Sequence, residues 1–350
     1  MRKVTLRGAI CLLLSAGSIA FAAKKPAAAP MPEWVNAPAT VYPNASYITN
    51  VGYASDRESA EIKALQGLAA VFGQSVKSDS EASQRMIQAK ADGKVATASV
   101  TAFSQNITRS VDVDCLIGVE VKEFWLEQST STWYAIAVLD KSKALQIYSD
   151  MISKNAAAIS TVLSSSAKDT FSLDGYAVYD FAEDIAIENE NHIKKVSVIQ
   201  PNAVAALKSY CPSSKDYHAK KVEIAKQIPL CVLVDNDVDG RIGAAFSAAI
   251  AAAGFRGTFD SNARYSLVAL LTFEQSDSTD GKTTRCRYNV ESFILDTETG
   301  EKVAPFSFSG REGHVSFAEA KNRAVKSLEA KVKSEFGKTF AGYLKNLAAE

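Results

Sequence analysis

Histidine, cysteine and tryptophan are scarce in this chain of 350 residues, which has three histidines, five cysteines and three tryptophans. No histidine has another histidine or a cysteine at a spacing typical of a metal site, and the separation of Cys211 from His218 matches no zinc signature. We therefore expect His192, His218 and His314 to be surface residues or hydrogen-bonded core residues. These residue types predict no metal, no cofactor and no catalytic residue.

An excess of charge of one sign is also absent, because 39 lysines and arginines balance 39 aspartates and glutamates. Proteins that bind nucleic acid depend on clustered basic residues, and no such cluster indicates that partner here. Beyond the first 22 residues, no apolar run is long enough to span a bilayer. Association with a membrane would therefore need a partner or an assembled surface.

The first 22 residues have the layout of a secretory signal peptide. Three basic residues precede an apolar run over 9–16, and small residues end the segment at Ala20-Phe21-Ala22. We expect cleavage after Ala22, followed by an Ala/Pro-rich tether over 23–33. Cys11 stands at the start of the apolar run and does not fit a lipid-attachment site. The chain is predicted to be exported, as a periplasmic or outer-membrane-associated protein.

Four cysteines would remain after cleavage, namely Cys115, Cys211, Cys231 and Cys286. An oxidising compartment permits disulfides among them, and four cysteines allow three complete pairings, between which the sequence does not choose. Cys115 and Cys231 lie in apolar, strand-like runs, where a cysteine is usually a small core residue.

A β-hairpin between Val111 and Lys143 is the organising element of the first predicted domain, 34–140. Its first limb alternates apolar and polar residues, and the alternation shifts by one at Lys122, which predicts a β-bulge. The second limb, Trp133 to Leu139, is apolar on both faces, which predicts a central strand covered on both sides. We expect Trp133 and Leu139 to be core residues.

A strand over 47–54 and a helix after it complete this domain, and a further strand or two is predicted within 76–107. Ser55 and Glu58 have the spacing of a capping box at the start of the helix. Its predicted apolar face consists of Ile62, Leu65, Leu68, Ala69 and Phe72.

A helical connector is predicted over 141–227. Its first helix carries an apolar stripe made of Leu145, Tyr148, Met151, Ile152, Ile159, Val162 and Leu163. A second helical region over 171–210 has interruptions near Asp174-Gly175 and at Pro201. A helical hairpin between two domains is the simplest interpretation.

The second predicted domain, 228–350, begins with a short buried strand over 229–234 and a helix ended by Gly254. Strands over 265–273, 287–295 and 303–308 follow, and Ser316 with Glu319 caps a long terminal helix. The fold class is therefore α+β, with two small α/β sandwich domains of mostly antiparallel sheets joined by a helical hairpin. The expected apolar face of the first helix is Ile242, Ala245, Phe246, Ala249 and Ile250.

The Asp235–Gly240 turn is the one candidate ligand site. Its alternating oxygen side chains and glycine match the opening of a calcium loop, but the twelfth position, which should be a bidentate glutamate, is Phe246. The competing hypothesis is a strand-to-helix turn in which Asp239 caps the helix and the other aspartates are solvated. We expect no calcium binding.

Several dispersed packing residues resemble the twenty-kilodalton lipoprotein family, which includes the flagellar envelope protein FlgP and is similar to the first domain of FlgT. The resemblance covers about the first third of the mature chain. It lies in Pro32-Glu33-Trp34, Val51-Gly52-Tyr53-Ala54, Leu116-Ile117-Gly118-Val119-Glu120-Val121 with Trp125, and Trp133 to Asp140. The second domain more weakly resembles the α/β modules of FlgT, TolB and curli-secretion proteins. The lipidated cysteine of the family is missing.

The resemblance implies an envelope protein with a structural or assembly role, with association with the flagellum as one form of it, and no catalytic residues. We therefore expect a non-enzymatic exported protein whose partners are other envelope or flagellar proteins or further copies of the chain. The alternative is a periplasmic binding or enzymatic module with a metal or small ligand at the Asp235–Gly240 turn. An accessory protein of outer-membrane secretion is a third hypothesis.

Overall fold

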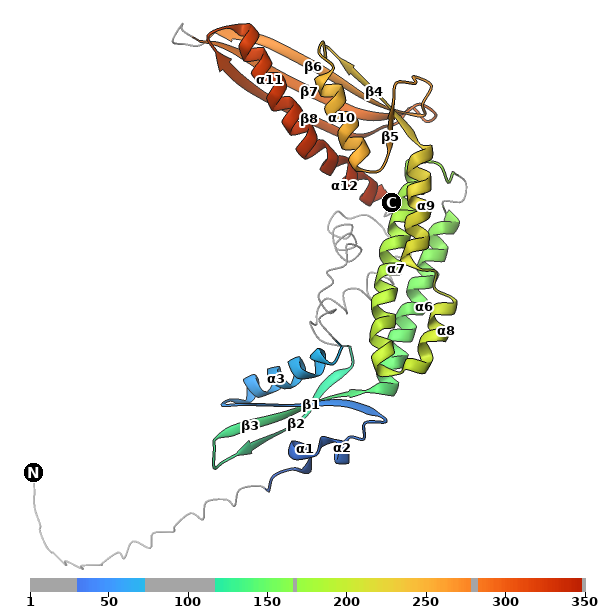
Figure 1. Cartoon of the computed structure of the whole chain (residues 1–350), viewed down its shortest axis with the longest axis vertical. Coiled ribbons are helices and arrows are strands. Elements are labelled where there is room, and N and C mark those ends of the chain that lie inside the picture. Colours follow the sequence, from blue (N-terminus) through green and yellow to red (C-terminus); the bar gives the residue numbers. More distant parts are fainter. Residues whose placement is uncertain (1–29, 73–116, 166–168, 278–282, 348–350) are drawn as a thin grey trace, which may run out of the picture.

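The computed structural model describes residues 30–72, 117–165, 169–277 and 283–347. Two α/β units lie at the two ends of a group of packed helices, and the whole forms a crescent (Figure 1). The predicted α+β class is confirmed. The predicted signal peptide, the strands expected within 76–107, the first part of the hairpin and Cys115 lie outside the described residues.

The amino-terminal unit contains an antiparallel sheet in the order β1-β3-β2, with bounds Tyr47–Ala54, Thr132–Asp140 and Val119–Glu127. β3 is the central strand, as predicted. Leu139 and its neighbours on the same side belong to one hydrophobic core, and Ile136 on the other side packs with Trp34. The predicted bulge is confirmed, because the register shifts between Val121 and Glu123. Trp133 is only partly buried, so its assignment to the core was too strong.

Helix α3, Arg57–Ala70, covers one face of this sheet. Its N-cap is Asp56, whose carboxylate accepts a hydrogen bond from the Ser59 backbone N–H at 2.8 Å, so the predicted capping box at Ser55 was wrong. Ile62 is also not a core residue, since 46% of it is exposed. The helix instead turns its alanines toward Gly52 of β1, where a Cβ atom would collide with the helix backbone. This close approach leaves no room for a large side chain.

The opposite face of the sheet is covered by α1, Glu33–Asn36, which is followed by α2, Pro38–Val41. The Trp34 indole N–H and the Tyr42 hydroxyl each donate to the Glu123 carboxylate, both at 2.9 Å. Glu123, the residue that follows the bulge, therefore fixes the amino-terminal segment on the sheet.

The helices between the two sheets are α6, Lys141–Ser165; α7, Leu173–Ile199; the short η1, Pro201–Ala203; α8, Val204–Ser209; and α9, Ser214–Gln227. We call α6 to α9 the helical column. α7 packs against both α6 and α9, which run beside it (Figure 1). The predicted helical hairpin was incomplete, because α9 adds a third long helix, with a capping box formed by Ser213 and Asp216.

The carboxy-terminal sheet has the order β5-β4-β6-β7-β8. β4, Pro229–Asp235, is parallel to β5, Arg256–Thr258, and to β6, Tyr265–Asp277. β7, Thr284–Asp296, and β8, Lys302–His314, continue the sheet antiparallel. The three-residue β5 was not predicted.

Helix α10, Arg241–Ala252, buries the five residues predicted for its apolar face. It ends before Gly254, whose φ of 90° is the left-handed conformation expected of a residue that follows a helix. This part of the second unit could be predicted because Gly254 and the helical spacing indicate the same boundary.

The terminal helix consists of α11, Phe317–Lys331, a π-helical turn at Val332–Phe336, and α12, Gly337–Leu347. Ser316 caps it by accepting from the Glu319 backbone N–H, which is the Ser316 half of the predicted capping box. The buried residues of this helix recur every four residues: Ala320, Ala324, Leu328, Val332, Phe336, Phe340 and Leu344. In a regular α-helix with 3.6 residues per turn, such a repeat would drift around the helix. The wider π turn corrects this drift and keeps the buried residues on one face, against the sheet.

Helix α7 contributes to both hydrophobic cores. Leu173 in its first turn belongs to the core of the carboxy-terminal unit, whereas Val196 and Ile199 near its end belong to the core of the amino-terminal unit. The Leu173 N–H donates to the Tyr265 hydroxyl at 3.2 Å, and the Tyr176 and Phe255 rings pack 4.7 Å apart. A single helix therefore joins the two units through packed residues.

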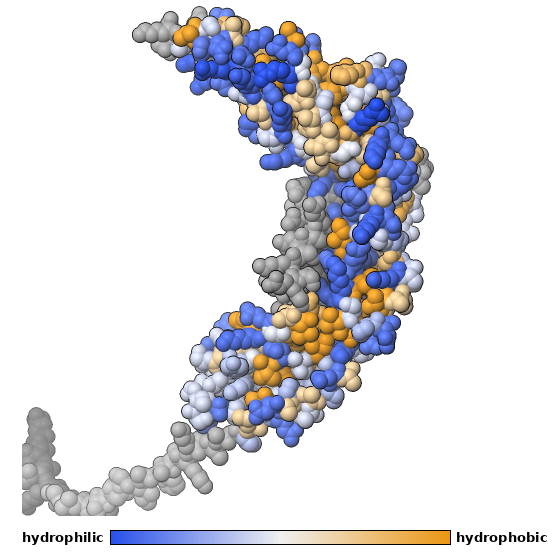
Figure 2. Space-filling model, viewed as in Figure 1, coloured by the Kyte–Doolittle hydropathy of each residue, from blue (hydrophilic) through white to orange (hydrophobic). Residues whose placement is uncertain are grey.

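Hydrophobic residues gather on the visible surface where the helical column meets the amino-terminal unit, while hydrophilic residues cover much of the carboxy-terminal unit (Figure 2). In the described ranges, no helix is both long and apolar enough to cross a membrane.

Candidate functional site

A cavity of about 500 Å³ lies on the helical column, between α7 and the segment that links α8 to α9. We call it the column cavity, and its defining residues are Asn189, Ile193, Lys194, Val204, Lys208 and Cys211. Its size is within the range of small-molecule sites in proteins, about 300 to 1,000 Å³. The cavity is therefore the strongest candidate for a binding site.

The gap between α8 and α9 produces this cavity. α8 ends at Ser209 and α9 begins at Ser214, so the chain crosses the face of α7 as an irregular segment that contains Pro212. Proline lacks a backbone N–H and is unfavourable within a helix. Because no continuous helix covers α7 here, side chains from α7 form the floor of an open hollow.

The floor of the column cavity combines apolar side chains with one buried amide. Ile193 is buried, and Asn189 is only 2% exposed. The Asn189 amide accepts from Asn155 at 2.9 Å, and its own N–H group donates to the Ile152 carbonyl at 3.4 Å. It also lies 3.8 Å from the Cys211 sulfur as a weak donor. The polar atoms at the floor are thus held in fixed positions.

The rim of the column cavity carries two lysines. Lys194 donates to the Asn191 side chain at 3.3 Å, and neither Lys194 nor Lys208 forms an ion pair with any residue that the structure describes. The one carboxylate in the lining, Glu190, accepts from the backbone N–H and the hydroxyl of Ser214, both at 2.9 Å. Two ammonium groups and one carboxylate therefore leave the rim with a net positive charge.

A second set of buried polar side chains, His192 and Glu188, lies on another side of α7. The His192 Nε2 and the Glu188 Oε1 are 3.5 Å apart, both residues are buried, and the Tyr148 ring packs 5.6 Å from the imidazole. Burial and the nearby Lys195 lower the pKa of His192 from 6.5 to about 3. Burial also raises the pKa of Glu188. Neither residue lines the column cavity, so the structure does not unite them with it.

Cys211, Cys231 and Cys286 are all free thiols, and Cys231 is buried, as expected of a core residue. Burial raises the pKa of the Cys211 thiol, which keeps it in the weakly nucleophilic protonated form. The cavity wall therefore supplies a reporter thiol rather than a nucleophile.

The Asp235–Gly240 turn contradicts the predicted cap at Asp239. Helix α10 begins at Arg241, and the backbone N–H of Gly243 donates to the Asp237 carboxylate at 2.7 Å. Gly240 is the N-cap residue in a left-handed conformation, with no side-chain cap. The Asp235–Gly240 turn folds back over the start of α10, and this brings the Asp237 carboxylate to the Gly243 N–H in the first turn of the helix. This carboxylate thus has a structural partner.

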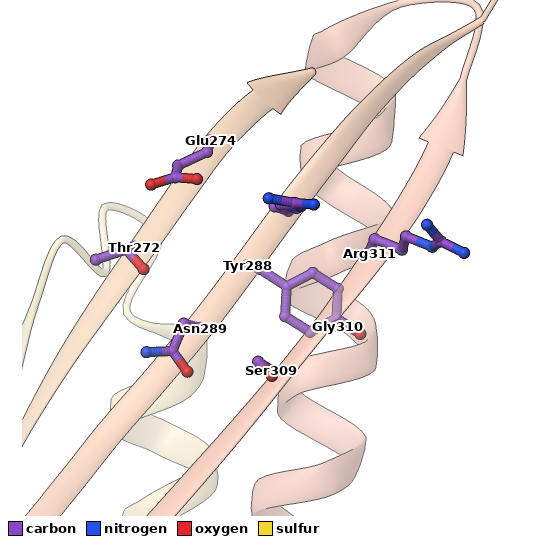
Figure 3. A pocket seen from close by; sticks show the side chains of 8 residues that line it. Thr272, Glu274, Tyr288, Asn289, Ser309, Gly310 and Arg311 are labelled. Carbon is purple, nitrogen blue, oxygen red and sulfur yellow. The ribbon is translucent and has the colours of Figure 1, made fainter. Parts of the chain in front are cut away.

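Another hollow, of about 530 Å³, lies along β6, β7 and β8 (Figure 3). Glu274, Arg287 and Arg311 are paired across the three strands in one register row. The Arg311 side chain extends away from Thr272 and Glu274 in Figure 3. These polar groups do not converge on a common point, so this hollow is a weaker candidate.

The part of the chain that the structure describes contains no group of three His, Cys, Asp or Glu residues that could hold a metal ion. His218 lies 3.0 Å from the Glu183 carboxylate on the surface. The sequence prediction missed the column cavity. The only signals for it were Pro212 and the capping pair Ser213 and Asp216 between two helical patterns.

No protein-family model matches the chain, and no curated protein matches it in sequence. Among solved structures, the secreted protein HP1454 of Helicobacter pylori is similar over 83% of this chain and 98% of its own, with 15% identity and a TM-score of 0.35. A minor lipoprotein of Acinetobacter baumannii is similar over 35% of this chain and 91% of its own, with 16% identity and a TM-score of 0.24. At these identities and scores, neither likeness carries an argument about function.

Proposed function

We propose that this chain is an exported, non-enzymatic protein of the cell envelope that holds two α/β units at a fixed separation. In this proposal the helical column is a spacer, and each unit offers a surface to other envelope proteins or to a second copy. The layout of residues 1–22 supports export, because it has the basic, apolar and small-residue regions of a signal peptide.

The observation that carries the proposal is the shared helix. α7 has 27 residues, which corresponds to about 40 Å. Because its two ends are packed into two different cores, bending between the units would expose apolar surface at one end. A flexible linker would have no such cost. The architecture therefore favours a spacer over two independently moving modules.

Electrostatic contacts where the helical column meets the carboxy-terminal unit also favour a rigid spacer. The Arg264 guanidinium donates through two nitrogens to the Asp296 carboxylate, and it also pairs with Asp169 just before α7. Burial would raise the pKa of Asp296, but hydrogen bonds from Arg264 hold it below its usual value. One arginine thus links the start of α7 to the carboxy-terminal sheet.

The finer form of this proposal is a role in flagellar assembly, which rests only on the family resemblance of the amino-terminal unit. The alternative function, a binding module at the Asp235–Gly240 turn, is weakened by the hydrogen bond that already occupies the Asp237 carboxylate. A binding role at the column cavity is compatible with the spacer.

Site-specific photo-crosslinking in intact cells tests the proposal. A photoreactive amino acid at Tyr53 in the amino-terminal unit and another at Val315 in the carboxy-terminal unit report on exposed apolar positions, with 63% and 74% exposure. Lys154 on the exposed side of α6 is the matched control. We expect crosslinks to envelope proteins or to a second copy from both units, and few from Lys154. Crosslinks confined to one unit, or a protein retained in the cytoplasm, would contradict the proposal.

A further inference from the structure

We propose that the column cavity binds a single-chain anionic amphiphile, a molecule with an apolar tail and one carboxylate, phosphate or sulfonate head group. The tail would lie against Ile193 and Val204, and the head group would lie between the ammonium groups of Lys194 and Lys208. This binding role goes beyond the spacer function and does not depend on it.

The shape and burial of the cavity floor support an apolar tail. Ala186 belongs to the core cluster of the upper part of the helical column, whereas Ile193 belongs to the core of the amino-terminal unit. The cavity thus opens where two cores meet without being closed by a continuous helix. An apolar tail inserted there would remove its own surface and that of the partly buried Val204 from water, which is favourable.

The charges at the rim specify an anionic head group. Two exposed lysines belong to the lining, and the single carboxylate there accepts hydrogen bonds from Ser214. A cation would therefore meet two like charges and the one carboxylate of Glu190, so the net charge of the lining favours an anion. A neutral tail would gain nothing from Lys194 or Lys208, so charge distinguishes the proposed ligand from a general apolar compound.

The buried polar atoms limit where the head group can lie. The Asn189 amide is engaged by Asn155 and by the Ile152 carbonyl, so it cannot turn to meet an anion without breaking those contacts. The Cys211 thiol beside it stays protonated because burial raises its pKa. The head group is consequently placed at the rim, with the tail directed inward.

Binding of dodecanoate to the purified protein is the direct test, measured by isothermal titration calorimetry below the concentration at which dodecanoate forms micelles. We expect saturable binding with one site per chain. Dodecyl phosphate and acetate form the comparison arms, because the first keeps the tail and changes the anion, whereas the second keeps the anion without the tail. Dodecyl phosphate should bind, and acetate should not.

Two variants separate the head-group site from the tail site. The double variant K194Q/K208Q should lower dodecanoate affinity about tenfold, in line with the loss of two partly exposed charge contacts. Ser197→Trp, at an exposed position in the cavity lining, should fill the opening and lower affinity at least as much. K154Q/K226Q removes the same charge from exposed positions elsewhere on the helical column and should bind like the unchanged protein.

Alkylation of Cys211 by iodoacetamide, followed by peptide mass spectrometry, locates the ligand. Dodecanoate should slow modification of the Cys211 peptide several-fold and should not do so in Ser197→Trp. The proposal is overturned if no saturable binding occurs, if dodecanol binds as tightly as dodecanoate, or if K194Q/K208Q and K154Q/K226Q lose affinity equally. Each variant is first checked for the circular dichroism spectrum of the unchanged protein.

Discussion

The backbone N–H of Leu173 donates a hydrogen bond to the phenolic oxygen of Tyr265 at 3.2 Å, which joins the first turn of α7 to the first residue of β6. Both residues are buried, and burial raises the pKa of Tyr265 to about 12. The first N–H groups of a helix have no partner within the helix. A residue from the distant sheet here satisfies one of them.

Tyr265→Phe should therefore lower the free energy of unfolding by about 1 to 3 kcal/mol, because it leaves the Leu173 N–H buried without an acceptor. Urea denaturation followed by circular dichroism measures this. Tyr53→Phe, at a largely exposed position of β1, is the matched control and should change stability by less than about 0.5 kcal/mol. Equal effects of the two substitutions would mean that this hydrogen bond does not stabilise the contact between α7 and β6.

Two glycines of the described chain should respond to alanine in opposite ways. Gly52→Ala places a Cβ atom against the backbone of α3 at Ala60 and Ala64 and should destabilise the protein by about 1 to 3 kcal/mol. Gly342→Ala in α12 meets open space and should stabilise it by about 0.5 to 1 kcal/mol, since alanine favours the helix. Thermal unfolding of both variants compares them. A neutral Gly52→Ala would show that α3 does not approach β1 this closely.

His192 should make stability fall as the pH is lowered. Its pKa is about 3 in the folded state and 6.5 in the unfolded state, so the unfolded chain binds an extra proton between these values. The stability that neutral His192 contributes is thus present above about pH 6.5 and is lost below it, with a limiting slope of about 1.4 kcal/mol per pH unit.

The raised pKa of Glu188 has the opposite effect, because it favours the folded state at low pH. The comparison is therefore made between Glu188→Gln and the double variant E188Q/H192Q, by chemical denaturation at about pH 7 and about pH 5. The single variant should lose more stability on acidification than the double variant. Parallel losses would place His192 in contact with solvent.

The acidic turn should be indifferent to calcium. Asp237→Ala should cost about 1 kcal/mol through loss of its bond to the Gly243 N–H, in calcium and in chelator alike, whereas Asp239→Ala should cost little. Thermal midpoints in both conditions test this. A calcium-dependent rise in the midpoint that disappears in Asp237→Ala would restore the binding-module alternative.

Local patterns in the sequence predicted the elements whose residues interact mainly with their neighbours in the chain. The one-residue shift at Lys122 predicted the bulge of β2, and the spacing from Ile242 to Ile250 predicted the buried face of α10. In both cases the period of the pattern follows directly from strand or helix geometry. Bulge position and buried face were consequently correct.

Contacts between distant segments account for the incorrect predictions. Ile62 has a favourable spacing for a core residue, but the alanines of α3 face Gly52 because the helix lies so close to β1. Asp239 stands one residue before the N-cap Gly240, and the turn instead brings Asp237 to the Gly243 N–H. His192 was expected at the surface or in the core, and its packing against Tyr148 of α6, which no local pattern encodes, places it in the core.

If α7 holds the two units at one separation, single-molecule energy transfer between dyes on the two units should report a single distance. Dyes are attached through non-natural amino acids at Gln66 on α3 and Arg323 on α11, both exposed, so that the native cysteines are kept. Packing of α7 into both cores predicts one narrow distribution of transfer efficiency in the purified protein. A broad distribution, or several populations that interconvert, would contradict the rigid spacer.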